Sequence, residues 1–195
     1  MLNDIQEIYF SKEQLKEITD RIGAQVSRDF EGKDLILISV LKGSVIFMAD
    51  LMRSITIPCR IDFITAQSYG QSMTSSGNVS ITKDISDNIE GCDILLVEDI
   101  FDSGNTLQRL SDYLATKNPS SITLCTLLDK PKRRDPNVKL VPKYIGAEVE
   151  DQFVVGYGLD YNQKYRNLPF IGILKPEIYN AKQHLFNQET KERVK

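Results

Sequence analysis

The feature that most constrains this chain is the run ILLVEDIFDSGNT at residues 94–106. Its first four residues are apolar, which predicts a strand buried on both faces, as in a parallel sheet. Beyond a short loop with one glycine, leucines recur at helical spacing. The run therefore predicts a strand, an acidic edge, a tight loop and a helix, which is where ligands bind in open α/β sheets. The acidic residues at this edge are Glu98, Asp99 and Asp102.

The loop after the acidic residues suits a phosphate monoester. Its backbone N–H groups can turn towards one point, two hydroxyls add donors, and the helix behind contributes partial positive charge. The adjacent acids upstream suit sugar hydroxyls, or a divalent cation that keeps several waters. Together these features describe a site for a ribose 5-phosphate. The loop residues are Ser103, Gly104, Asn105 and Thr106.

Residues 97–106 closely resemble the phosphoribosyl pyrophosphate (PRPP) signature of the purine phosphoribosyltransferases, a type I family, and most of all its members that use hypoxanthine and guanine. The chain has no G-x-x-x-x-G-K-[ST] run, which excludes a kinase-type P-loop. The resemblance implies that the four loop residues bind the 5-phosphate, and that Glu98 and Asp99 bind the ribose hydroxyls and Mg²⁺. It further implies that Asp102 handles the proton at the imidazole edge of the purine as general base or acid.

A second loop of the same kind, at residues 41–44, follows an apolar strand predicted at 35–40 and precedes an apolar helix. Alone, this loop is typical of a helix cap with a solvated lysine. Beside the PRPP-like signature it resembles the family's pyrophosphate loop. The resemblance implies that Lys42 and Gly43 contact pyrophosphate, and that the peptide bond between Leu41 and Lys42 can be cis.

Residues 67–83 are rich in Ser, Thr and Gly and poor in apolar side chains. A loop of this length in a compact domain is a functional lid or a disordered insertion, and a plain flexible hairpin is the alternative. Ser68 and Tyr69 resemble the start of the family's mobile catalytic loop. This resemblance favours a lid, running from Ser68 to Lys83, that covers the bound pyrophosphate and excludes water.

A further strand, predicted at residues 122–128, ends at Asp129, and Lys130 follows at the presumed ligand side. By resemblance Lys130 matches the lysine that recognises the 6-oxo group of the purine. Residues 132–134 are a basic run, for which we predict a solvated turn.

The run FVVGYGLDY at residues 153–161 closely matches the second diagnostic motif of the family. The resemblance implies that Phe153 stacks on the base, that Val154 contacts it through the backbone, and that Asp160 meets a second Mg²⁺. Arg166 matches the arginine that holds pyrophosphate. Residues 144–149 and 153–158 are predicted as strands.

The fold class expected is α/β, with a mostly parallel central sheet flanked by helices, the type I phosphoribosyltransferase fold. A small hood over the base site, built from both chain ends, completes the expected domain at residues 1–180, and residues 181–195 form a polar tail. A helix begins at Ser11 with a capping box to Gln14 and runs to about residue 30. A last short strand is predicted at residues 169–174.

The formal charge of −3 argues against nucleic acid as the main partner, so local donors and metal must hold a polyanionic substrate. The three cysteines show no C-x-x-C spacing, which points to a reducing compartment. The amino terminus carries no signal-peptide pattern, and no apolar run approaches the ~20 residues that span a membrane. We therefore expect a cytoplasmic protein without membrane contact.

The function implied is the Mg²⁺-dependent transfer of a 5-phosphoribosyl group from PRPP to N9 of hypoxanthine, and also of guanine, in purine salvage. The products are IMP or GMP and pyrophosphate, and the enzyme is expected to be a homodimer or homotetramer. Xanthine, adenine or a pyrimidine are alternative bases, although Lys130 disfavours adenine because adenine lacks a 6-oxo acceptor. A PRPP-binding regulator of nucleic acid is the alternative from another class, but no basic stripe supports it.

Overall fold

The computed structural model describes residues 1–68 and 79–180, and within it the chain forms two compact units. The larger unit consists of residues 16–151. The smaller unit combines residues 1–15 with the chain from residue 152 onwards. Each unit is described by itself.

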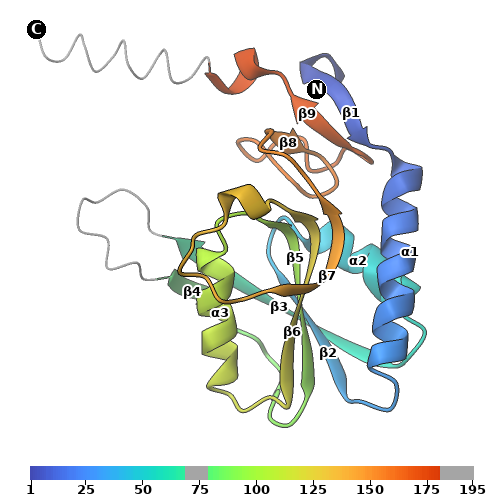
Figure 1. The fold of residues 1–195 in the computed structure, drawn as a ribbon, viewed down its shortest axis with the longest axis vertical. Coiled ribbons are helices and arrows are strands. Elements are labelled where there is room, and N and C mark those ends of the chain that lie inside the picture. Colours follow the sequence, from blue (N-terminus) through green and yellow to red (C-terminus); the bar gives the residue numbers. More distant parts are fainter. Residues whose placement is uncertain (69–78, 181–195) are drawn as a thin grey trace, which may run out of the picture. The chain divides into compact units, whose positions relative to one another are not determined.

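The larger unit is built on a six-stranded sheet in the order β4-β3-β2-β5-β6-β7 (Figure 1). All neighbouring strands are parallel except β3 and β4, which confirms the predicted α/β fold with a mostly parallel sheet. The strands are β2 (Leu35–Val40), β3 (Cys59–Ser68), β4 (Val79–Lys83), β5 (Asp93–Phe101), β6 (Ser121–Asp129) and β7 (Pro142–Glu148).

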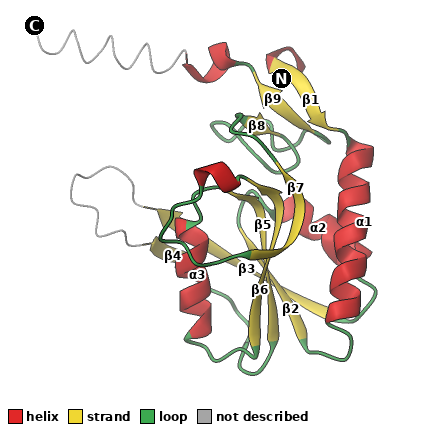
Figure 2. Ribbon diagram, viewed as in Figure 1, coloured by secondary structure: helices red, strands yellow, loops and turns green. Residues whose placement is uncertain are grey.

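Helices cover both faces of this sheet (Figure 2). The α1 helix (Lys12–Asp29) and α2 (Val45–Ser54) lie on one face, and α3 (Asn105–Ala115) lies on the other. The β2 strand in the middle of the sheet is buried at all six residues, as its continuous apolar sequence predicts. Its Ile36 and Ile38 pack into one cluster with Leu107 and Leu110 of α3. Because successive strand side chains alternate, β2 supplies the core on both faces.

The first helix begins as its sequence predicts. Ser11 and Gln14 form the expected capping box: the Ser11 N–H donates to Gln14 Oε1 at 2.8 Å, and the Gln14 N–H donates to Ser11 Oγ at 3.3 Å. No helix in the described part of the chain is both long and apolar enough to cross a membrane.

The outer side of β7 is an edge of the sheet, and α1 reaches it with one side chain. Arg21 Nη2 donates to the carbonyl oxygens of Ile145 (3.2 Å) and Gly146 (2.7 Å). A Cβ at position 146 would overlap the carbonyl oxygen of Leu127 and crowd Ile18 of α1, so a glycine lets the helix approach this strand closely.

The smaller unit is a three-stranded antiparallel sheet in the order β1-β9-β8, made of β1 (Ile5–Phe10), β8 (Val154–Val155) and β9 (Ile171–Leu174). The β1 strand is not predicted by the sequence pattern. The strand predicted at 153–158 shortens to two residues, because Gly156 (φ 99°) and Gly158 (φ 103°) turn the chain in the left-handed region.

The long loop predicted at residues 67–83 is wrong at both ends. The β3 strand continues to Ser68, and residues 79–83 form β4, which pairs with β3 in antiparallel fashion. Tyr69 and the rest of residues 69–78 lie outside the described part of the chain, as does the tail at 181–195.

Candidate active site

Most of the residues predicted to bind PRPP, together with Lys130 predicted for the base, lie at one edge of the larger unit's sheet. Because β2, β5 and β6 are parallel neighbours, their carboxyl ends lie at the same edge. Lys42 and Gly43 follow β2, the run 102–106 follows β5, and Lys130 follows β6. Ser68 ends β3, the next strand of the same sheet. The sheet therefore brings together, from four strands, chain segments far apart in the sequence.

Two of the three acidic residues lie inside β5, and only Asp102 follows its end. The strand runs to Phe101, so Glu98 and Asp99 are strand residues, and Glu98 pairs in register with Thr126 of β6. Pairing with β6, which continues to Phe101, extends the strand beyond the apolar run from which it was predicted. Successive strand side chains point to opposite faces, so the two carboxylates leave β5 on different sides.

The Glu98 carboxylate is unusual because one of its oxygens, Oε2, is buried without a hydrogen-bond partner among the described residues. Loss of hydration, together with the nearby charge of Asp99, raises the pKa of Glu98 well above its ordinary value. A buried oxygen of this kind is costly unless a hydroxyl or a cation meets it. Glu98 therefore suits either a ribose hydroxyl or a divalent cation, the two ligands that the sequence predicts.

Asp99 lies against the loop at residues 41–44. It is 8% exposed, and one oxygen accepts a hydrogen bond from the Ile100 N–H at 2.8 Å. A Cβ at Gly43 would overlap the other carboxylate oxygen of Asp99, so this close approach requires a glycine. The peptide bond between Leu41 and Lys42 is cis, which confirms that prediction.

Buried hydroxyls fix the far side of the same loop. Ser44, the residue before α2, is fully buried, and its Oγ lies 2.7 Å from Ser39 Oγ and donates to the Val40 carbonyl at 2.5 Å. Because these bonds tie the end of β2 to the start of α2, the loop between them has little freedom to move away from Asp99.

We expect Gly43→Ala to lower the free energy of unfolding by about 1–3 kcal/mol, the usual cost of overpacking. The physical reason is the overlap of the new methyl group with the Asp99 carboxylate. Urea denaturation of the single variants and of Gly43→Ala/Asp99→Ala tests this cause. In the Asp99→Ala background the added methyl group should cost less than half as much. An equal cost in both backgrounds would show that the strain arises elsewhere.

The loop between β5 and α3 has the form that the sequence predicts for an anion site. Gly104 adopts the left-handed conformation (φ 83°) and is the residue before α3. Its carbonyl accepts the Gln108 N–H at 2.9 Å, while the first N–H groups of the helix have no helical acceptor. The Asn105 side chain donates to Asp135 at 3.1 Å, which ties the loop to the segment that follows β6.

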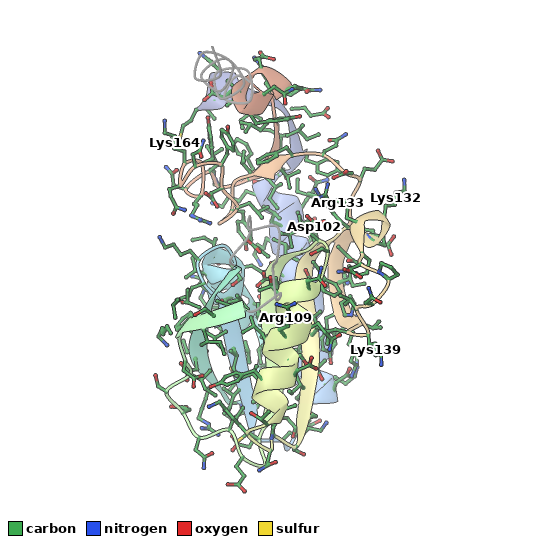
Figure 3. All side chains as sticks on the ribbon, turned by 90° about the vertical axis from the view of Figure 1, so that its left-hand side faces the viewer. Asp102, Arg109, Lys132, Arg133, Lys139 and Lys164 are labelled. Carbon is green, nitrogen blue, oxygen red and sulfur yellow. The ribbon has the colours of Figure 1, made fainter. Side chains whose placement is uncertain are left out.

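The basic run after β6 includes a turn on which Lys132 and Arg133 are exposed, as predicted, but Arg134 is largely covered and both arginines bind carboxylates. Arg133 Nε donates to Asp102 Oδ1 at 2.7 Å, and its Nη1 donates to both oxygens of Asp151, at 3.1 and 3.2 Å. Figure 3 shows Asp102 and Arg133 close together, with Lys132 on the same turn. Lys130, only 7% exposed, has its Nζ 3.6 Å from Asp151 Oδ1.

Arg134 binds the ends of two strands together. Its guanidinium carbon lies 3.1 Å from the centroid of the Phe101 ring, its Nη1 donates to the Asp102 carbonyl at 2.9 Å, and its Nη2 pairs with Asp129. Burial raises the pKa of Asp129, although Arg134 opposes this effect. The signal that could have indicated both arginines is their position immediately after a strand end on the ligand side.

In the smaller unit, the predicted metal ligand and the predicted pyrophosphate ligand form an ion pair. Arg166 Nη2 lies 2.7 Å from Asp160 Oδ1, and its Nη1 donates to the Gly158 carbonyl at 2.7 Å. The other Asp160 oxygen accepts the Gln163 N–H at 2.7 Å. Arg166 Nε is buried without a partner among the described residues.

Phe153, the predicted base-stacking residue, belongs to an aromatic group. Its ring is 38% exposed and stacks on Tyr179, with centroids 5.0 Å apart and planes at 20°. Tyr161 meets the same ring edge-on at 5.5 Å, and Val154 beside it is buried in β8. Tyr179 was not predicted as part of this group, because an isolated aromatic residue in a polar segment belongs to no motif.

Within residues 1–68 and 79–180, no group of three or more His, Cys, Asp or Glu side chains is placed to hold a metal ion. Mg²⁺ does not need such a group, because it commonly keeps several waters and binds one or two carboxylates together with substrate phosphates. The unpartnered buried oxygen of Glu98 fits a ligand set of that kind.

A model of the phosphoribosyl transferase domain matches residues 6–162, and the chain belongs to the phosphoribosyltransferase family. It is 43% identical over 180 residues to a hypoxanthine-guanine phosphoribosyltransferase of Staphylococcus aureus, covering 92% of this chain and 99% of that protein. Two solved structures are similar. A hypoxanthine phosphoribosyltransferase of S. aureus has a TM-score of 0.87 and 44% identity, over 92% of this chain and 96% of that one. A hypoxanthine-guanine phosphoribosyltransferase of Bacillus anthracis has a TM-score of 0.83 and 47% identity, over 88% and 99% respectively.

Proposed function

We propose that this phosphoribosyltransferase transfers the 5-phosphoribosyl group of PRPP to N9 of hypoxanthine and guanine, giving IMP or GMP and pyrophosphate in purine salvage. One observation carries the choice of base. A nearly buried lysine, Lys130, directly follows β6, the strand beside β5, and β5 carries the PRPP-like signature. An ammonium group is a donor only, so it selects a base with an acceptor at position 6.

The start of α3 would hold the 5-phosphate. The N–H groups and hydroxyls of residues 103–106 supply donors, and the helix terminus favours the negative charge. Glu98 and Asp99 would bind the ribose hydroxyls. As the bond from the ribose to pyrophosphate breaks, the ribose gains positive character, and carboxylates stabilise that charge.

The pyrophosphate leaves with a high negative charge, so its binding groups should be cationic. Lys42, the Gly43 backbone, Arg166, Ser68 and Tyr69 are the proposed ligands. Mg²⁺ bound through Glu98 and Asp99, and a second Mg²⁺ at Asp160, would neutralise phosphate charge. The lid predicted from Ser68 to Lys83 falls mainly on residues 69–78, outside the described part of the chain, and its last five residues form β4.

Asp102 would move the purine's proton. N9 of the base becomes a nucleophile as the imidazole ring loses a proton, and a carboxylate within hydrogen-bond reach can accept it. Asp102 suits this role because its side chain is 40% exposed and therefore accessible to a ligand. Phe153 and the Val154 backbone would bind the base itself.

The pair formed by Phe153 and Tyr179 gives a test of base binding. An aromatic pair is worth about 0.5–1.5 kcal/mol beyond its buried area, so Tyr179→Leu should raise KM for hypoxanthine roughly 2- to 12-fold. The KM for PRPP should stay within twofold. Tyr179→Phe, which keeps the stacked ring, is the matched control and should behave as the wild type. A Phe variant as impaired as the Leu variant would assign the effect to the hydroxyl group.

The proposed function is tested by pyrophosphate release from PRPP and Mg²⁺ with each common nucleobase in turn. Hypoxanthine and guanine should support turnover, adenine and pyrimidines should not, and EDTA should abolish the reaction. Turnover with xanthine alone would change the proposed base. Binding of RNA or DNA that weakens along a salt series, without turnover on any base, would support a regulator instead.

We further propose a cytoplasmic homodimer or homotetramer that binds neither nucleic acid nor membrane. A cytoplasmic location is supported by the free thiols of Cys59, Cys92 and Cys125, which are typical of a reducing compartment. Sedimentation of the purified protein would measure its assembly.

A further inference from the structure

We propose that Arg133 is a positioning residue that holds the carboxylate of Asp102 and couples it to Lys130 through Asp151. This inference rests on the proposed function. It adds two residues, Arg133 and Asp151, to which neither the motifs nor the comparisons assign a part. It also joins the proton-handling residue and the base-reading residue, which the sequence presents as independent.

The contacts form one continuous chain of alternating charges. Asp102 Oδ1 accepts from Arg133 Nε at 2.7 Å, and Asp151 accepts from Arg133 Nη1 at 3.1 and 3.2 Å. Asp151 Oδ1 in turn lies 3.6 Å from Lys130 Nζ. Two carboxylates and two cations thus balance, and both carboxylates raise the pKa of Arg133. The guanidinium of Arg133 touches both carboxylates.

The backbone directs Arg133 towards Asp102. The 3-10 helix η2 (Pro131–Arg133) begins with a proline, whose fixed φ suits the first position of a helical turn. The Arg133 N–H donates to the Lys130 carbonyl at 3.0 Å, so the turn folds back at once after β6. Arg134 then holds the Asp102 carbonyl at 2.9 Å. Both the main chain and the side chain of Asp102 are therefore fixed from this one turn.

This series of ion pairs is better suited to orienting the Asp102 carboxylate than to stabilising the fold. The side chains of Arg133, Asp102 and Asp151 are 49%, 40% and 56% exposed, and ion pairs of that exposure contribute little to folding. A planar guanidinium with donors in a rigid fork can nevertheless fix the angle between two carboxylates. A half-exposed aspartate without such a partner would sample several rotamers, and only some would present an oxygen to the base.

Arg133→Met keeps the length of the side chain and removes the fork. We expect kcat with hypoxanthine to fall about tenfold, as for a misplaced catalytic group, while KM for PRPP changes less than twofold. Lys132→Met is the matched control, since Lys132 lies on the same turn and makes no ion pair within the described residues. Its kcat should equal that of the wild type. Equal losses in the two variants would overturn the proposal.

A double-mutant cycle separates positioning from general charge effects. In an Asp102→Asn background, Arg133→Met should lower kcat by less than twofold, because its target is already inactive. A further tenfold loss there would show that Arg133 acts elsewhere. Arg133→Lys keeps a charge without the fork, so it should recover only part of the lost kcat. Full recovery would refute the role of the fork.

The proposed function is tested separately, with the wild-type enzyme. An absence of turnover with every nucleobase would refute the proposed function. The contact has its own readout that needs no turnover. The ¹⁵N-labelled Nε–H signal of Arg133 should shift and exchange faster with solvent in Asp102→Ala than in Lys132→Met. An unchanged signal in Asp102→Ala would overturn the proposal even in an active enzyme.

Discussion

Asp102→Asn is expected to lower kcat with hypoxanthine by about 10²-fold or more, with a much smaller change in KM for PRPP. The amide keeps the shape of the carboxylate and still offers Arg133 Nε an acceptor oxygen, so the geometry at the end of β5 should survive. What it loses is the ability to take a proton from the imidazole ring of the base. Steady-state kinetics in both substrates measure the two constants separately.

Asp112→Asn is the control for that variant, because Asp112 lies exposed on α3 and accepts a hydrogen bond only from Gln108 Nε2 among the described residues. It should retain wild-type kinetics. A kcat for Asp102→Asn near that of the control would remove Asp102 from the chemistry.

Lys130→Met is expected to lower kcat/KM for hypoxanthine roughly 10- to 150-fold, because a charge-assisted hydrogen bond is worth about 1.5–3 kcal/mol. KM for PRPP should barely change. The fold should tolerate the change, since Asp151 stays paired with Arg133 and is itself 56% exposed. Initial rates at varied base and varied PRPP give both values.

Thermal unfolding provides the second measurement for Lys130→Met. A methionine suits the nearly buried position, so the midpoint should move little. Equal losses for the base and for PRPP, together with a lowered midpoint, would mean that the lysine supports the fold rather than the choice of base.

The sequence predicted the sheet well wherever burial is continuous. The limits of β2 follow from its apolar run, and α1 follows from its capping box. The β1 strand was missed because its residues are largely exposed, so its pairing with β9 from the far end of the chain has no local signal. Residues 79–83 were missed for the same reason: a polar strand at the edge of a sheet depends on its partner.

In the candidate site, only residues that belong to a recognisable sequence motif could be predicted. The motifs placed Lys42, Asp102 and Lys130 at the ends of strands, and the parallel order of those strands brings them to one edge. The ion pairs of Arg133 depend on where a three-residue turn directs a long side chain. No pattern of residue types encodes that direction, and a basic run on a loop resembles any other.

The contact of Arg21 with β7 bears on how copies of this protein meet one another. A strand at the border of a sheet offers unpaired carbonyls to any extended segment, and so can recruit another chain into a growing sheet. Here a guanidinium from α1 already binds two carbonyls of this border strand, at Ile145 and Gly146. An incoming strand would have to displace a charged side chain and leave it without its acceptors. The border thus resists uncontrolled strand addition without being covered by another strand.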